Sequence, residues 1–226
     1  MSNGIKVKKR NGRGTEALNL EKMHKMVDEA TQGLAGVSAS QVEIQSGIQF
    51  YDGITTAEIQ EILIKSASDL IDLDHPNYQF VAARLLLFSI RKSLYGRSRE
   101  LPQLEDHIVK CVSQEVYDGD IYSKYSKEDI EKANGYIDHT RDFLFTYAGL
   151  RQVVDKYLVQ DRSTGQVYET PQFMYMMIAL TIFAEYPKET RLNYVRRYYN
   201  AISKHKINIP TPIMAGVRTP IRQFAS

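Results

Sequence analysis

Basic residues and two helix starts near the N-terminus could together bind a polyphosphate. Residues 8–10 (Lys-Lys-Arg) end a short basic segment, and residues 19–22 (Asn-Leu-Glu-Lys) can open a helix whose free amide groups attract an anion. A second helix start at residues 55–56 (Thr-Thr) adds amides and hydroxyls, and residues 91–92 (Arg-Lys) add charge. Each feature alone is more typical of a solvated surface or an ordinary helix cap, so the pattern leaves both interpretations open.

A glycine pattern lies between the basic segment and the first helix start. Gly12, Gly14 and Ala17 fit G-x-G-x-x-A, the pattern of dinucleotide-binding folds. That fold needs a buried strand before the glycines, whereas the segment before them carries Lys6 and the basic residues 8–10. The pattern therefore favours a hairpin turn, and the chain contains no P-loop motif.

Cys111 is the single cysteine of the chain, and His107 precedes it by four residues. This spacing places both side chains on one helical face, where a nucleophilic Cys/His pair is conceivable. We favour a buried structural cysteine beside a surface histidine, since no third residue is evident that would orient the histidine. One cysteine also excludes an internal disulfide, and no Cys/His group has zinc-site spacing.

The segment from Pro210 to Ser226 is rich in proline. Pro212 should restrain Thr211 to extended conformations and hold its hydroxyl free for a sugar or a phosphate. The alternative is an irregular loop, and the pattern by itself slightly favours the loop.

The elements that must position these residues are mostly helical. Residues 5–17 read as a short hairpin, and apolar periodicity predicts four helices at about 20–34, 38–50, 55–73 and 77–95. Thr55 and Glu58 form a capping box at the start of the third helix. Residues 1–96 thus form a predicted first domain, and residues 96–102 are the best linker candidate.

Residues 97–226 form the predicted second region. Helices are expected at about 104–116, 126–138, 142–157, 171–185 and 187–204, with a hairpin around residues 157–168. After residue 206 the pattern changes to extended chain, which predicts an unfinished β element. The fold class is therefore mainly α with small β elements.

Composition limits the class of protein. Lys and Arg number 29 against 27 Asp and Glu, giving a net charge of +2, so no strong overall nucleic-acid signature exists, although a local basic patch remains open. The longest apolar run, residues 173–184, is too short to cross a bilayer, and the N-terminus has no signal-peptide core. We expect a soluble cytoplasmic protein that partners neither nucleic acid nor membrane.

Several motifs resemble one enzyme family. Those resembling the ATP cone of class I ribonucleotide reductase large subunits are residues 7–12 (Val-Lys-Lys-Arg-Asn-Gly), 18–22 (Leu-Asn-Leu-Glu-Lys), 52–56 (Asp-Gly-Ile-Thr-Thr) and 78–84 (Tyr-Gln-Phe-Val-Ala-Ala-Arg). Residues 138–142, 156–159, 164–169 and 187–191 resemble the helical region that follows the cone. Residues 210–220 and 222–224 resemble the start of the family's ten-stranded α/β barrel, so the resemblance covers essentially the whole chain.

The resemblance implies an ATP cone that serves as an allosteric activity site, where ATP activates and dATP inhibits, with Mg²⁺ accompanying the nucleotide. The fold implied is a hairpin-plus-four-helix cone, then a helical region and the first strand of an incomplete barrel. Carried over by motif, the residues that would contact the effector are Lys9, Glu16, Ala17, Leu18, Asn19, Leu20, Glu21, Lys22, Thr56 and Lys92.

The resemblance also implies a reaction, the reduction of ribonucleoside diphosphates to deoxyribonucleoside diphosphates for DNA synthesis. Thr211 and Ser226 match family positions that contact the ribonucleoside diphosphate substrate. The family's first redox-active cysteine follows the position of Ser226, so no catalytic residue and no metal site are expected here. The complete enzyme would need a small (beta) subunit with its radical metallocofactor and a thioredoxin or glutaredoxin reductant.

These expectations lead to the hypothesis that a separate, complementary C-terminal polypeptide supplies the catalytic cysteines, as in a split gene. An intein-interrupted precursor or a deliberately shortened chain would end in the same way. We expect no reductase activity from this polypeptide alone. The alternative is a non-catalytic regulatory or adaptor protein that senses ATP and dATP.

Overall fold

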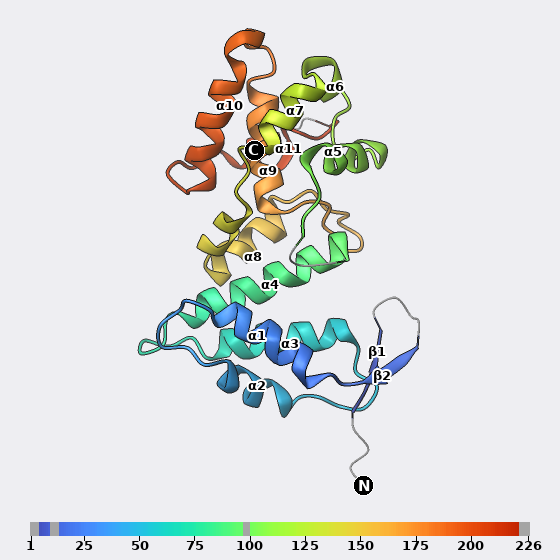
Figure 1. The fold of residues 1–226 in the computed structure, drawn as a ribbon, viewed down its shortest axis with the longest axis vertical. Coiled ribbons are helices and arrows are strands. Elements are labelled where there is room, and N and C mark those ends of the chain that lie inside the picture. The colour runs from blue at the N-terminus through green and yellow to red at the C-terminus, as the bar shows by residue number, and fades with distance from the viewer. Residues whose placement is uncertain (1–4, 10–13, 97–99, 222–226) are drawn as a thin grey trace. The chain divides into compact units, whose positions relative to one another are not determined.

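The computed structural model describes residues 5–9, 14–96 and 100–221 of the chain. Two compact units divide it: residues 1–89 with 145–151, and residues 90–144 with 152–226. Figure 1 gives the order of the elements. The domain boundary predicted after residue 96 stays a prediction.

The first unit contains the predicted hairpin and helices. Its elements are β1 (Lys6–Lys8), β2 (Thr15–Ala17), α1 (Leu20–Thr31), α2 (Ala39–Gly47), α3 (Thr56–Asp69) and most of α4 (Tyr78–Tyr95). β1 and β2 pair antiparallel, which confirms the hairpin, although residues 10–13 of its turn lie outside the described residues. Gly33 follows α1 with φ +74°, a conformation that glycine adopts without strain and that ends the helix.

The core of the first unit comes from one face of each helix. α2 packs against both α1 and α3. Each of these three helices contributes a fully buried apolar side chain to the core: Val27, Val42 and Leu63. Arg84 on α4 donates to the carbonyls of Ala30 and Gln32, at 3.1 and 2.7 Å, and so joins α4 to the end of α1. The predicted hairpin-plus-four-helix arrangement is therefore present.

The second unit is helical apart from a short hairpin. Its elements are the end of α4, α5 (Leu104–Ser113), α6 (Ile121–Lys124), α7 (Lys127–Asn134), η1 (His139–Leu144), the end of α8 (Tyr147–Lys156), α9 (Pro171–Ile182), α10 (Lys188–Ser203) and α11 (Thr211–Gly216). Gln160 and Val167 form an antiparallel bridge, which confirms the predicted hairpin between α8 and α9.

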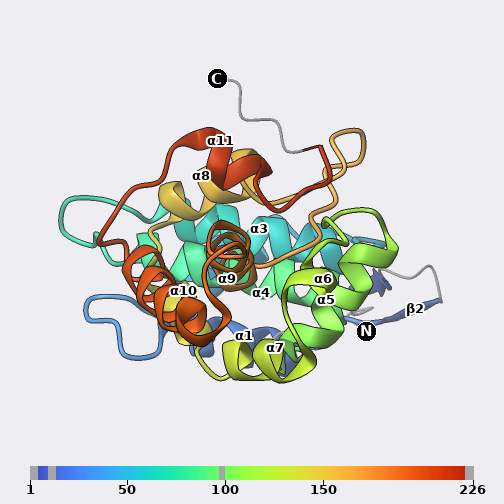
Figure 2. The same ribbon diagram turned by 90° about the horizontal axis from the view of Figure 1, so that it is seen from above.

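Helix α9 forms the centre of the second unit. Every residue from Pro171 to Leu180 is buried, as expected for a helix that is apolar on all sides. It packs against α10, η1 and α11, and Figure 2 shows it nearly end-on. The predicted apolar run at 173–184 is thus a core helix. Among the described residues, no helix is long and apolar enough to span a membrane.

Several boundaries in the second half differ from prediction. The helix expected at 126–138 ends at Asn134, and the one expected at 142–157 is two elements, η1 and α8. Thr146 explains the break because its hydroxyl accepts from Gly149 N at 3.2 Å and so starts α8 as a new helix. The four-residue α6 was not predicted at all.

The segment after α10 also differs from the expected extended chain. Residues 207–210 belong to no strand, and α11 begins at Thr211 with Pro212 in its first turn. The expectation that Pro212 keeps Thr211 extended was therefore wrong. A proline in the first helical turn sacrifices only an amide that has no intrahelical partner, so the helix can start there. The start of a barrel remains a prediction.

Candidate nucleotide-binding site

Strand β1 connects three pieces of the candidate site in the first unit. One edge pairs with β2, where Val7 lies opposite Glu16. The other edge pairs with the segment before α3, through Lys8 N to Ile54 O and Gly53 N to Lys6 O, both 2.8 Å. This double pairing places the hairpin beside the start of α3, although β1 lies more than 40 residues before the segment with which it pairs.

The start of α1 follows β2 directly and is capped as predicted. Asn19 is the N-cap residue, and its Oδ1 accepts from Lys22 N at 2.8 Å. This bond satisfies the third amide of the helix, whereas the amides of Leu20 and Glu21 precede the first intrahelical bond. Both residues are exposed, so these two donors face solvent where an anion can reach them.

The start of α3 has the same construction. Thr55 and Glu58 form the predicted capping box, with Glu58 N donating to Thr55 Oγ1 at 3.1 Å and Thr55 N donating to Glu58 Oε2 at 2.8 Å. Thr56 is therefore the first helical residue, and its amide and that of Ala57 lie before the first intrahelical bond. Thr56 is partly exposed and follows Thr55, which is bridged to Lys8 of β1.

The charges around β1 are mixed. Lys9 and Glu16 form an ion pair of 3.0 Å between Nζ and Oε2, and both side chains are almost half exposed. Hydrogen bonds from Thr55 lower the pKa of Glu58, and the positive charge of Lys8 adds to the same effect. The site thus offers lysine ammonium groups for phosphates and a carboxylate on Glu16 that can accept from a sugar hydroxyl or help to hold a cation.

Gly53 permits the close approach of β1. It has φ +84°, and a Cβ there would lie 3.8 Å from Lys8 Cε. Any other residue would be strained in this conformation, and its side chain would contact the aliphatic stem of Lys8. In the sequence, Gly53 is part of the Asp-Gly-Ile-Thr-Thr motif at residues 52–56. The pairing with β1 that gives it this position left no local signal in the sequence.

Two parts of the chain match two family models. One, described as ATP cone domain, matches residues 5–93, and the other, described as ribonucleotide reductase, all-alpha domain, matches residues 143–222. The chain belongs to the ribonucleotide reductase family.

Individual relatives agree with this assignment. The chain is 51% identical over 226 residues to ribonucleoside-diphosphate reductase 1 subunit alpha of Escherichia coli, covering all of the chain and 29% of the relative. The alpha subunit of Enterobacteria phage T4 is 44% identical over 214 residues, 94% of the chain and 28% of the relative. The alpha subunit of Helicobacter pylori is 35% identical over 223 residues, which are 98% of the chain and 27% of the relative. The chain therefore spans less than a third of the curated reductase subunits it matches.

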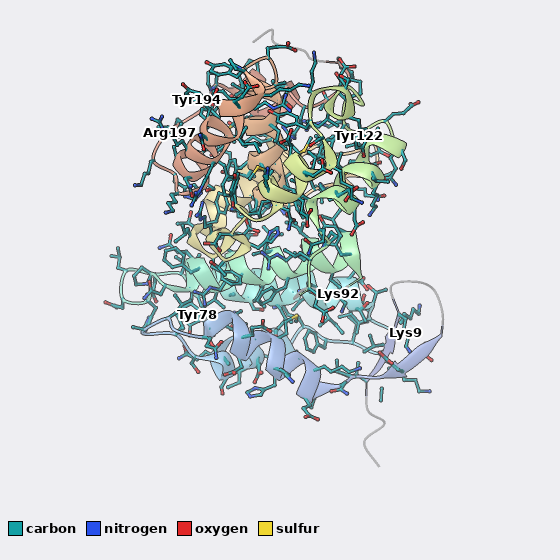
Figure 3. All side chains as sticks on the ribbon, turned by 45° about the horizontal axis from the view of Figure 1, so that its top comes forward. Lys9, Tyr78, Lys92, Tyr122, Tyr194 and Arg197 are labelled. Carbon is teal, nitrogen blue, oxygen red and sulfur yellow. The ribbon has the colours of Figure 1, made fainter. Side chains whose placement is uncertain are left out.

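The structure brings most of the predicted effector residues together. The hairpin and the two helix starts carry all of them except one: Lys9, Glu16, Ala17, Leu18, Asn19, Leu20, Glu21, Lys22 and Thr56. The exception, Lys92, is an exposed residue near the end of α4, beyond the first unit. Figure 3 labels Lys9 and Lys92. Their roles in binding a nucleotide stay predictions.

The predicted substrate residue Thr211 lies in the second unit. It is exposed in the first turn of α11 and lines a groove of about 1050 Å³. Its hydroxyl is 3.5 Å from the hydroxyl of Tyr157, so it is less isolated than expected. Ser226, the other predicted substrate residue, lies outside the described residues.

His107 and Cys111 correct one prediction. Cys111 is buried as expected, but His107 is buried too, with its ring stacked on Phe173 at 4.2 Å. Burial lowers the pKa of His107 to about 3 and raises that of Cys111 to about 12. A neutral thiol beside a neutral imidazole is inert at neutral pH, so the pair packs the core. Among the described residues, no group of acidic, histidine or cysteine side chains could hold a metal.

Proposed function

We propose that the first unit binds ATP and dATP as regulatory effectors of a ribonucleoside-diphosphate reductase. The observation that carries this proposal is the double pairing of strand β1, which joins β2, the strand that leads into the capped start of α1, on one edge and the capped start of α3 on the other. Open amides at Leu20, Glu21 and Thr56 would donate to phosphate oxygens, helped by the positive ends of both helix dipoles. The ATP cone match over residues 5–93 supports the same proposal.

Within this site, the side chains have different proposed roles. The ammonium groups of Lys9 and Lys22 neutralise phosphate charge, and the hydroxyl of Thr56 donates to a phosphate oxygen. Glu16 is ion-paired with Lys9 in the free chain. When the nucleotide binds, the Glu16 carboxylate accepts a hydrogen bond from a sugar hydroxyl or binds the Mg²⁺ that the nucleotide carries. Lys92 supplies further charge to the same phosphates.

The second unit is proposed to contribute to the substrate site. Thr211 and Ser226 would contact the ribonucleoside diphosphate, and the catalytic cysteines would come from the C-terminal portion of the alpha subunit. A beta subunit would supply the radical. The names of the relatives support the reductase role. The chain by itself should reduce no nucleotide.

Calorimetric titration of the full chain with ATP and with dATP tests effector binding. Lys9→Met and Thr56→Val should each weaken binding about tenfold, the effect of losing one charge-assisted phosphate contact. Lys25→Met removes an exposed charge from the next turn of α1 and serves as the matched control. Affinities of Lys9→Met and Thr56→Val equal to that of Lys25→Met would refute the proposed site.

Reconstitution tests the reductase role. The chain is mixed with the C-terminal portion of an alpha subunit, a beta subunit and a thiol reductant, and deoxyribonucleotide formation is measured. Product should appear only in the complete mixture. If no product forms while ATP and dATP still bind, the adaptor alternative replaces the enzyme proposal.

A further inference from the structure

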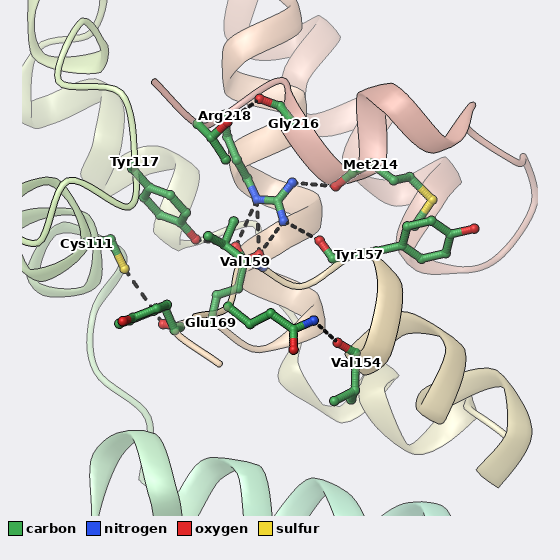
Figure 4. A network of polar contacts seen from close by, with 12 residues as sticks. Cys111, Tyr117, Val154, Tyr157, Val159, Glu169, Met214, Gly216 and Arg218 are labelled. Carbon is green, nitrogen blue, oxygen red and sulfur yellow. Dashed lines mark hydrogen bonds and ion pairs between the residues drawn. The ribbon is translucent and has the colours of Figure 1, made fainter. Parts of the chain in front are cut away.

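Arg218 and Glu169 form a fully enclosed ion pair behind the groove that contains Thr211. Neither side chain has any exposed surface. Figure 4 shows the guanidinium of Arg218 at the centre of a polar network that joins three segments of the second unit. Neither residue lines the groove itself, so the pair cannot contact a ligand there.

The guanidinium holds two backbone carbonyls as well as the carboxylate. Nη1 donates to Met214 O at 2.5 Å, Nη2 donates to Tyr157 O at 2.8 Å, and Nε donates to Glu169 Oε2 at 3.0 Å. Glu169 in turn accepts from Val159 N at 2.7 Å and from the hydroxyl of Tyr117. All three nitrogens of Arg218 are thus committed to fixed partners.

The two tethered carbonyls belong to the segments that carry two neighbouring hydroxyl groups of the groove, those of Tyr157 and Thr211. Met214 lies three residues after Thr211 in the six-residue α11, and Tyr157 carries the hydroxyl that lies 3.5 Å from Thr211 Oγ1. Figure 4 shows the side chains of Tyr157 and Met214 directed toward each other. A six-residue helix is unstable by itself, so its position depends on such tertiary contacts.

The groove has the chemistry of a diphosphate site. Two adjacent hydroxyls can donate to one phosphate oxygen, and Lys156 and Arg162 on the same lining add positive charge against one carboxylate, that of Glu115. The separation of the two hydroxyls decides whether both can reach the same oxygen. Whatever fixes α11 against Tyr157 therefore fixes the geometry of the site.

We propose that Arg218 is a positioning residue for the Thr211–Tyr157 hydroxyl pair, and that Tyr157 joins Thr211 in binding the diphosphate of the substrate. This inference rests on the proposed reductase function for its ligand. The claim that Arg218 holds α11 in place concerns only how firmly that helix is formed, and it is testable without substrate. Glu169 acts with Arg218 by holding the guanidinium in place.

Arg218→Lys is the test variant because it keeps the charge but loses the planar fork that reaches three partners at once. Arg191→Lys is the matched control. Arg191 is also buried in the second unit, pairs with Asp129 at 2.7 Å and lies over the ring of Tyr125, but it does not line or tether the groove. Both variants should lower the melting temperature, whereas only Arg218→Lys should loosen α11.

Hydrogen exchange of backbone amides measures this loosening. In Arg218→Lys, the amides of Met214 and Val217, which close α11, should exchange about tenfold faster than in the unaltered chain, as expected for losing one or two hydrogen bonds. Amides of α9 and α10 should accelerate only by the smaller factor that the loss of global stability predicts, as in Arg191→Lys. Equal acceleration over all three helices, or the same pattern in Arg191→Lys, would refute positioning by Arg218.

The unaltered chain offers a second measurement in case Arg218→Lys does not fold. Its α11 amides should exchange as slowly as those of α10, despite the shortness of the helix. Exchange of α11 at the rate of an unstructured peptide would overturn the proposal without any variant.

Ligand binding separates this inference from the proposed function. A ribonucleoside diphosphate such as CDP is titrated into the reconstituted reductase, and Arg218→Lys and Tyr157→Phe should each weaken it about tenfold, the loss of one charge-assisted bond. ATP binding to the first unit should stay unchanged in both variants. If CDP does not bind at all, the substrate part of the proposed function and the ligand role of Tyr157 fail, and hydrogen exchange still decides the positioning role.

Discussion

Arg91 and Asp142 form a buried ion pair, with 2.9 Å between Nη2 of the arginine and Oδ2 of the carboxylate. The arginine also donates to His139 O at 2.9 Å, and the second oxygen of Asp142 accepts from Gln172 Nε2 at 2.9 Å. The pair therefore joins the end of α4 to η1 and to the core helix α9.

Breaking this pair should be costly. Asp142→Ala leaves the guanidinium of Arg91 buried without its carboxylate, which should lower the free energy of unfolding by about 3–5 kcal/mol. The control is Glu185→Ala, which removes an ion pair of 2.7 Å with Lys124 where Glu185 is 80% exposed. That change should cost less than about 1 kcal/mol in urea unfolding. Similar costs for the two variants would contradict the prediction.

Buried histidines should make the protein sensitive to acid. Burial lowers the pKa of His107 to about 3 and that of His139 to about 4, whereas 6.5 is the ordinary value. Between about pH 4 and 6.5 the unfolded chain therefore binds more protons, so stability is full above pH 6.5 and falls as the pH drops. Each histidine should contribute a slope of about 1.4 kcal/mol per pH unit.

The variant His107→Phe should remove its share of that slope. A phenyl ring can keep the stacking on Phe173, and Tyr117 keeps its bond to Glu169, so the fold should persist. Urea unfolding at several pH values between 4.5 and 7 measures the slope in both proteins. A slope that does not change in the variant would show that His107 is not the group responsible.

Cys111 should resist alkylation while the protein is folded. Burial raises the pKa of its thiol to about 12 from an ordinary 9.0, so the thiolate fraction at pH 8 should fall about a thousandfold. Mass spectrometry after iodoacetamide treatment reads this directly, because the chain has one cysteine. If Cys111 of the folded protein reacts with iodoacetamide as fast as it does in urea, the predicted protection of the thiol is wrong.

The cap of α3 should stabilise the first unit measurably. Thr55→Ala removes the hydroxyl that accepts from Glu58 N, which should lower the free energy of unfolding by about 1 kcal/mol. Thr55→Ser retains a hydroxyl and is the matched control. Chemical denaturation followed by circular dichroism should separate the two variants, and equal midpoints would argue against the capping role.

Local sequence signals determined most of the first unit and part of the second. Asn19 and Thr55 begin helices at the predicted places because a capping side chain bonds to amides only two or three residues away. Apolar periodicity likewise located α4 and α9. The predicted helix boundaries were wrong where short-range preferences compete. Thr146 starts α8 as a new helix, and Pro212 lies in the first turn of α11.

The family also followed from the sequence, since its motifs are runs of adjacent residues. Burial did not. His107 is four residues from Cys111 in any helix, but only the packing of Phe173 from α9 makes it buried and neutral. Its neighbours along the chain give no sign of that contact.

The sequence by itself determined which residues carry charge, which cap helices and which motifs match a reductase. Only the tertiary structure decided that β1 joins the hairpin to the start of α3, and that Arg218 reaches Tyr157 across 61 residues. Helix caps and periodicity act over one or two turns, so the sequence can reveal them. Pairing between distant segments depends on the burial of the whole unit, and no local pattern specifies it.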